Sequence, residues 1–147
     1  MATKDSVQVA KLSPATPTKN AERDWGGTSR KFSFTYVAAV GNETVGNILR
    51  AVKLPPGCLV VDYWLQWEAL SSAGGTAGAD VGLTGDGQRY LTAQDMDAAG
   101  AIRATAVIDK MPDRTPIADD ATFFILTVTG EAWLAAKKVQ GWVEIVP

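Results

Sequence analysis

The chain of 147 residues has the length of one domain, and its 46% hydrophobic and 20% charged content excludes a largely disordered protein. Its net charge of −2 gives no electrostatic reason to expect nucleic acid as a partner, and no apolar run reaches the ~18 residues of a membrane span. The absence of histidine excludes Ser-His-Asp, Cys-His and histidine-bearing zinc sites. The single Cys58 excludes an internal disulfide, and its place at the start of an apolar stretch predicts a buried, inert thiol.

Residues 1–30 differ in composition from the rest of the chain. They are rich in Ser, Thr, Pro and Lys, and the steps into Pro14 and Pro17 favour extended backbone. Through Lys31 the segment holds six basic and three acidic residues, a net charge of +3, which leaves −5 for the remainder. Its first residues are polar and lack the apolar stretch of a signal peptide, so we expect synthesis and retention in a cytoplasm.

Two interpretations of this N-terminal segment stay open. One is a floppy terminus, which is common. The other is an arm that becomes ordered against a neighbouring subunit, anchored by Trp25 before the Gly26-Gly27 flex point, because an exposed Trp in a polar tail is unfavourable in water. In the second case Arg23, Trp25 and Arg30 are interface residues.

From Lys31 onward the sequence predicts strands. Phe32, Phe34 and Tyr36 alternate with polar residues in the period of two that is typical of a half-buried strand. The segment 121–129 is apolar on both faces near its middle, which suits a central strand. Turns rich in glycine and proline separate the segments, and the predicted strands are 31–36, 47–53, 58–70, 79–84, 88–91, 102–108, 121–129 and 139–146.

The alternation also predicts which face each side chain occupies in the longest strand. One face, directed to the core, holds Leu59, Val61, Tyr63, Leu65 and Trp67, and the more polar face holds Val60, Asp62, Trp64 and Gln66. In the second strand the same rule places Ile48, Arg50 and Val52 on one face, and in the last strand it places Trp142 on the face opposite Val143.

The number and length of these segments define the fold class. About eight short strands separated by turns, with no long helical periodicity, indicate a β-sandwich or barrel. Between the predicted strands, residues 93–100 are expected to make one helical turn. Residues 132–138 are expected to form a loop or a single turn. A turn is expected at 85–87.

Carboxylates and glycines give no catalytic or ligand-binding pattern. A glycosidase holds two carboxyl groups several ångströms apart across a sugar, whereas the acidic pairs here lie in turn-like sequence, where capping explains them. The region 80–87 lacks the register of an EF-hand loop, and no Gly-Lys-Ser/Thr phosphate loop occurs. We therefore predict no catalytic residue, no cofactor and no metal site; the acidic pairs are Asp95 with Asp97 and Asp119 with Asp120.

The tryptophans are candidates for a protein interface or a carbohydrate platform. Trp67 lies on an apolar face, so core packing is expected for it. Trp64 and Trp142 share faces with polar residues and are the better interface candidates. Base stacking is not expected on a body with a net charge of −5.

Three stretches of the sequence resemble small structural proteins of tailed bacteriophages. They are a strand at 48–62 interrupted by Leu54-Pro55-Pro56-Gly57, the run 81–91 with its Gly85-Asp86 turn, and the closing strand 139–146. The resemblance is to head decoration, or cement, proteins, and it covers most of residues 31–147. It implies a jelly-roll fold, association as dimers or trimers, attachment across neighbouring major capsid subunits, and no chemistry. No functional residue is carried over, because the motif residues look like turn and core positions.

These observations lead to one set of predictions. Residues 1–30 form an extended arm and 31–147 a jelly-roll domain of about eight antiparallel strands. The expected role is capsid decoration on the outer surface of a virion, with the major capsid protein and further copies of the chain as partners, and without nucleic acid or membrane. The alternatives are a receptor- or glycan-binding module that uses Trp64, Trp142 and the Gly74-Gly75 loop, and a carboxylate hydrolase.

Overall fold

The computed structural model describes residues 3–5, 29–38, 43–104, 117 and 122–146. These ranges contain no helix, and so none with the length and hydropathy needed to cross a membrane. They contain nine strands, β1 (Thr3–Asp5), β2 (Arg30–Val37), β3 (Ile48–Lys53), β4 (Leu59–Trp67), β5 (Gly78–Leu83), β6 (Asp86–Asp95), β7 (Gly100–Arg103), β8 (Phe123–Thr129) and β9 (Lys138–Val146).

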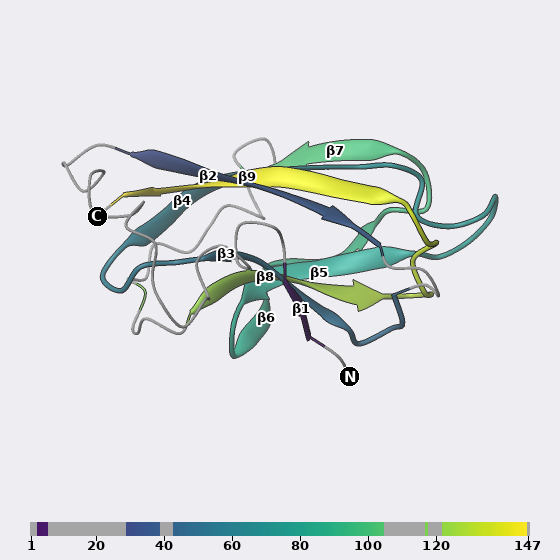
Figure 1. The fold of residues 1–147 in the computed structure, drawn as a ribbon, viewed down its shortest axis with the longest axis horizontal. Coiled ribbons are helices and arrows are strands. Elements are labelled where there is room, and N and C mark those ends of the chain that lie inside the picture. Colours follow the sequence, from purple (N-terminus) through teal and green to yellow (C-terminus); the bar gives the residue numbers. More distant parts are fainter. Residues whose placement is uncertain (1–2, 6–28, 39–42, 105–116, 118–121, 147) are drawn as a thin grey trace.

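The strands form two sheets that pack face to face (Figure 1). One sheet has the order β2-β9-β4-β7 and the other the order β1-β3-β8-β5-β6. Apart from β1, the first strand pairs with the last, and the next pairs nest inside it: β2 with β9, β3 with β8, β4 with β7 and β5 with β6, all antiparallel. Four strand pairs rolled up in this order make a jelly roll. The predicted all-β sandwich is confirmed.

A continuous apolar core fills the space between the sheets. Phe34, Leu65 and Val143 are buried there, together with a ring cluster in which Tyr63 lies 5.4 Å from Phe124 between centroids. Trp67 is also buried, as predicted, and its Nε1 donates to the carbonyl of Ala98 at 2.9 Å. Removal of this apolar surface from water is the main force that holds the two sheets together.

Two bulges overturn the predicted faces of β3 and β4. In β4 the register slips between Val60 and Asp62, so Val60 is buried and Val61 is only half-buried, the reverse of the predicted placement. In β3 the slip between Arg50 and Val52 leaves Ala51 and Val52 both buried, whereas simple alternation separates them. A bulge places two residues opposite one, which breaks the period of two that the prediction assumed.

The hairpin of β5 and β6 also departs from the sequence expectation. Leu83 pairs with Asp86, so the turn is centred one residue earlier than predicted, with Gly85 at φ +89°. Strand β6 continues to Asp95, residues 97–99 form a bend and β7 begins at Gly100, so the helical turn predicted for 93–100 is wrong. The buried carboxylate of Asp80 explains the extension, because it accepts hydrogen bonds from the Ala93 amide at 2.6 Å and from the Gln88 side chain at 2.8 Å.

Strand β7 begins two residues earlier than the strand predicted for 102–108, and residues 105–108 lie outside the described part of the chain. Residues 132–137 form a loop with a turn at Ala135 and Ala136, in agreement with the predicted loop or single turn. Two main-chain hydrogen bonds between Glu43 and Trp133 hold this loop. The Glu43 carboxylate is buried and accepts hydrogen bonds from the Tyr36 hydroxyl and from Asn47 Nδ2. These donors compensate the cost of taking a carboxylate out of water.

Three buried weak acids are held in their neutral forms. Burial raises the pKa of the Cys58 thiol to about 11, and its Sγ donates to the Pro55 carbonyl. Burial, with a smaller contribution from Asp62, raises the pKa of Tyr63, whose hydroxyl has no hydrogen-bond partner among the described residues. Burial and the adjacent Glu43 raise the pKa of Tyr36. A buried neutral thiol fits the predicted inert cysteine.

We expect stability to fall at alkaline pH. Each of these groups has a higher pKa in the folded chain than in the unfolded chain. Its contribution to the free energy of unfolding is complete below the unfolded pKa and is lost as the pH rises through the folded pKa. The loss should begin near pH 9 for Cys58, whose ordinary pKa is 9.0, and near pH 10 for the tyrosines. Urea unfolding at pH 7 to 11 measures it. Above pH 10 the free energy of unfolding should fall less steeply with pH in Tyr63→Phe than in the wild type. An unchanged slope would contradict the raised pKa of Tyr63.

Candidate functional site

The strand register brings the two tryptophans predicted as interface residues side by side. Trp64 of β4 lies directly opposite Trp142 of β9, on the outer side of the four-stranded sheet. Ser33 of β2 flanks Trp142, and Arg103 of β7 flanks Trp64, so four side chains form one row across the sheet. Both indoles are partly exposed. We call the outward surface of this sheet around Trp64 and Trp142 the tryptophan face.

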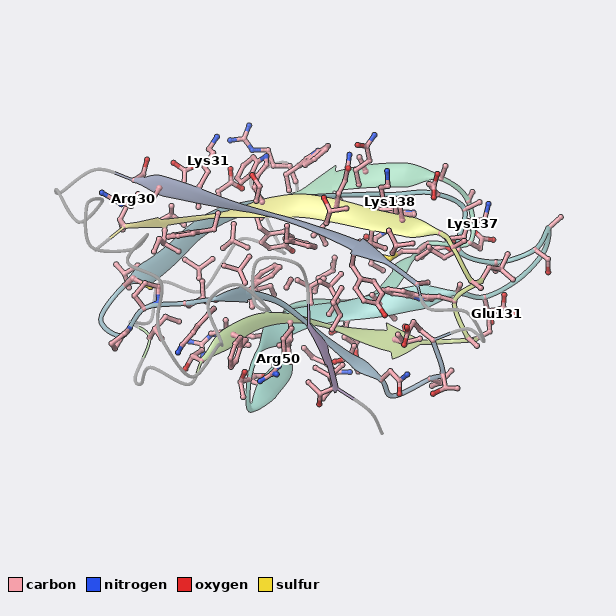
Figure 2. The ribbon with its side chains drawn as sticks, in the orientation of Figure 1. Arg30, Lys31, Arg50, Glu131, Lys137 and Lys138 are labelled. Atoms are coloured by element: carbon pink, nitrogen blue, oxygen red, sulfur yellow. The ribbon has the colours of Figure 1, made fainter. Side chains whose placement is uncertain are left out.

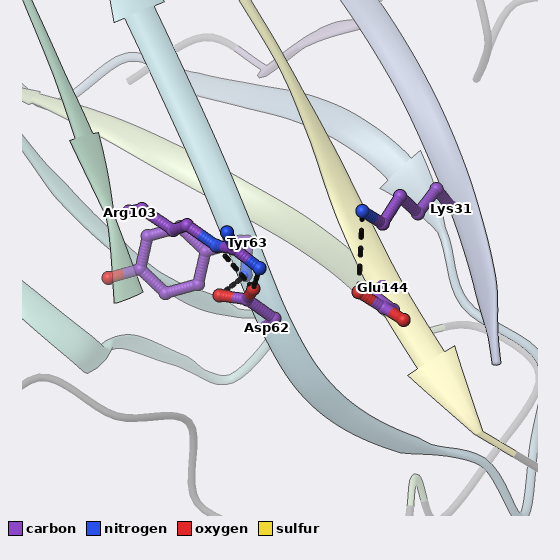
Figure 3. Close-up of polar contacts among 5 residues, drawn as sticks. All are labelled: Lys31, Asp62, Tyr63, Arg103 and Glu144. Carbon is purple, nitrogen blue, oxygen red and sulfur yellow. Dashed lines mark hydrogen bonds and ion pairs between the residues drawn. The ribbon is translucent and has the colours of Figure 1, made fainter. Parts of the chain in front are cut away.

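A charged row runs beside the aromatic row. Register places Lys31, Glu144 and Asp62 next to one another across β2, β9 and β4. Lys31 Nζ lies 3.7 Å from Glu144 Oε2, and this lysine side chain is half exposed (Figure 3). Lys31 stands on the outer side of its sheet, on the side of the molecule away from Arg50 (Figure 2).

Trp142 lies between two cations. Lys31 Nζ is 4.1 Å from the centre of its ring, and the Arg103 guanidinium is 5.4 Å from it. Both distances fall within the ~6 Å over which the negative face of an indole attracts a cation. The two contacts restrict the orientation of the indole on the outer side of the sheet.

Arg103 is positioned by a buried carboxylate. Asp62, 4% exposed, accepts Arg103 Nε at 2.7 Å and the amide of Tyr63 at 2.9 Å, and Arg103 Nη2 lies 2.6 Å from the same carboxylate (Figure 3). The guanidinium forks around one carboxylate oxygen, which is a strong, charge-assisted arrangement. Asp62 lies two residues before Trp64 on β4, and Trp64 lies opposite Arg103 on β7, so Asp62 and Arg103 share the outer side of the sheet.

Amides and a second charged pair continue the surface toward the other end of the sheet. Gln140 Nε2 donates to Gln66 Oε1 at 2.8 Å, and the Lys138 amide donates to Glu68 at 2.7 Å. These four residues line a shallow, open depression of about 380 Å³. The tryptophan face thus carries three cations, Lys31, Arg103 and Lys138, and three anions, Asp62, Glu144 and Glu68. The formal charges on this face therefore balance.

The remaining predicted site residues have different outcomes. Arg30 is the first residue of β2, is partly buried and pairs with Ile145 near one end of the sheet. Arg23 and Trp25 lie outside the described residues. Gly75 of the loop considered for glycan binding packs against Ser71 and Glu131, at the end of the sandwich.

Sequence reasoning did not select Lys31, Asp62 or Arg103 as site residues. For Asp62 the available signal was its place on the polar face with Trp64. No signal in the sequence indicated that Arg103 would contact Trp142, because that contact depends on the pairing of β7 and β9 with opposite sides of β4.

The described carboxylates are engaged in structure. Asp95 Oδ1 accepts the amide of Asp97, and Asp97 Oδ1 accepts the amide of Ala98, as turn capping predicts. Asp119 and Asp120 lie outside the described residues. Within the described ranges no group of three or more His, Cys, Asp or Glu side chains is arranged to hold a metal ion.

Comparison with known proteins finds solved structures of similar fold, among them chains of two phage capsids. No protein-family model matches the chain, and no curated protein matches its sequence. A chain of the "Cyanophage Pam1 capsid asymmetric unit" has a TM-score of 0.68 and 22% identity, and the match covers 90% of this chain and 98% of that one. A chain of the "Capsid of Ralstonia phage GP4" has a TM-score of 0.70 and 20% identity, over 99% and 97% of the two chains. What is shared is the fold.

The Asp62–Arg103 contact should contribute more to stability than the Lys31–Glu144 contact. Arg103→Met leaves a buried carboxylate without its cation, so we expect a loss of about 1–3 kcal/mol in the free energy of unfolding. Lys31→Met is the matched control, because it removes the other cation from Trp142 but breaks only a half-exposed ion pair, worth up to about 1 kcal/mol. Urea denaturation measures both. Equal losses would contradict the burial argument.

Proposed function

We propose that this protein is a structural component of a bacteriophage virion, which decorates the outer surface of the capsid and stabilises the shell by bridging major capsid subunits. One observation carries the proposal: both similar structures are capsids by title, and each matches over nearly the full length of both chains. A match of that extent includes the whole jelly-roll body.

The tryptophan face supports a role in binding protein. Trp and Arg are enriched among the residues that dominate protein interfaces, and the charges around Trp64 and Trp142 balance. The Trp142 ring already contacts Lys31 and Arg103, and Arg103 is bound by Asp62, so little ordering of this side chain is needed on association. The proposed partner of this face is the major capsid protein, and the proposed role includes no enzymatic activity.

The N-terminal arm, residues 1–30, is the second proposed contact. Its basic character differs from the acidic body, and an extended segment can add to a neighbouring subunit with its own backbone hydrogen bonds. A body contact and an arm contact on different subunits make a bridge. Many copies, each with a modest interface, then resist expansion of the shell through avidity.

A glycan-binding module is the alternative that the tryptophan face favours. Two adjacent, partly exposed indoles with the Gln66 and Gln140 amides beside them provide stacking surface and hydrogen-bonding groups of the kind that sugars use. Binding of the purified protein to a glycan array, lost in Trp142→Ala, would favour this alternative over capsid decoration.

Capsid binding tests the proposal directly. Purified protein is added to phage heads that lack it, and co-sedimentation is quantified against the major capsid protein. We expect saturation at a fixed ratio and a higher temperature of DNA release. The double variant Trp64→Ala/Trp142→Ala should bind at least tenfold more weakly, while Val45→Ala, at an exposed position outside the tryptophan face, should bind normally.

Circular dichroism of each variant checks that the sandwich is folded. Deletion of residues 2–28 removes the arm and leaves β2 intact, so it tests the arm contact separately from the contact made by the body. The shortened chain should also bind phage heads more weakly. Absence of the protein from purified virions, or wild-type occupancy by all of these variants, would contradict the proposal.

A further inference from the structure

Strand β1 is an addition to the jelly-roll arrangement of the other strands. Its residues pair with β3 in parallel, Thr3 opposite Ile48, Lys4 opposite Leu49 and Asp5 opposite Arg50, whereas the other strand pairs of the described residues are antiparallel. Without β1, strand β3 is the edge of its sheet. An uncovered edge presents unpaired amide and carbonyl groups, so it can accept a strand from any chain that reaches it.

The accepting edge is held in place independently of β1. Strand β3 pairs along its length with β8, and Leu49 is buried in the core. On the outer side Ile48 packs against Phe123 and Ile125. Because these contacts fix β3 from three directions, the edge keeps its shape whether the strand beside it comes from the same chain or from another.

The connection from β1 to β2 is long for the positions it joins. Asp5 lies opposite Arg50 in the middle of β3, and because the two strands are parallel β1 runs toward the Lys53 end of β3. Arg30 lies opposite Ile145, which itself faces Val60 at the start of β4. Only a short turn separates β3 from β4, so both points are at the same end of the sandwich. Connections between neighbouring elements have a median length of about 4–6 residues, and here 24 residues, 6–29, separate the two strands.

That length of chain can reach a second molecule. Fully extended, 24 residues span roughly 80 Å, and a body of this size is roughly 35 Å across. Charge favours contact of this segment with an acidic body, its own or that of a second copy, because the chain through Lys31 carries +3 and the remainder −5.

We infer that β1 is exchanged between copies of this chain, so that residues 3–5 of one molecule pair with β3 of a second. The exchange forms the same strand pairing as closure within one chain, which makes it a low-cost route to self-association. The occupant of the β3 edge is thus a second copy. The inference concerns the protein in solution and goes beyond the proposed role on a capsid.

Disulfide trapping tests the exchange. In a Cys58→Ser background, full-length chains carrying Thr3→Cys are mixed with differently tagged chains carrying Ile48→Cys, and the mixture is oxidised. Exchange places these two positions opposite each other in different molecules, so we expect a mixed disulfide dimer on a non-reducing gel. Thr3→Cys mixed with Lys53→Cys is the matched control, because Lys53 lies on the same strand beyond the paired residues. It should give at least tenfold less mixed dimer.

The chain that carries both Thr3→Cys and Ile48→Cys separates exchange from internal closure. Exchange gives covalent multimers, whereas closure within one chain gives a monomer with an internal disulfide, and a purely monomeric product would overturn the inference. Absence of any disulfide would overturn it too, since β3 would then be open to another partner.

The molar mass in solution provides a readout without cysteines: a chain lacking residues 1–5 should self-associate at least tenfold more weakly than the full chain. Equal self-association of the two chains would also overturn it.

Discussion

The pairing of β9 with β2 on one side and β4 on the other is the constraint on which the rest of the structure depends. It joins the last strand of the chain to the first strand of the body and closes the jelly roll. On the inner side it carries Val139, Val143 and Ile145 into the core. On the outer side the same register aligns the charged, aromatic and amide rows, so the core and the tryptophan face are two consequences of one ladder.

The tryptophan face shows how a surface can be rigid without being buried. Trp142 is held from both sides by cations, and one of these, Arg103, is itself held by the buried Asp62. The chain of contacts ends in the body of the sheet, where the Tyr63 amide also donates to Asp62. A side chain whose position depends on such a chain keeps one conformation, which favours specific recognition of a partner.

The two sides of the sandwich therefore suit different interactions. The tryptophan face is a broad surface with balanced charge, whereas the β3 edge offers backbone hydrogen bonds to an extended strand. Surface contacts depend on matching side chains, and edge pairing depends mostly on main-chain geometry. The capsid contact proposed for the tryptophan face and the exchange inferred for β1 therefore use separate parts of the surface.

The sequence by itself determined the fold class, the positions of most strands and the outward placement of Trp64 and Trp142, because the period of two is a local property of the chain. It also predicted the buried Trp67 and the inert Cys58. It did not determine the bulges in β3 and β4, the strand β1, or the contacts of Arg103. These depend on which strands become neighbours and in what register, and that is decided by packing between residues far apart in the chain, such as Arg103 and Trp142.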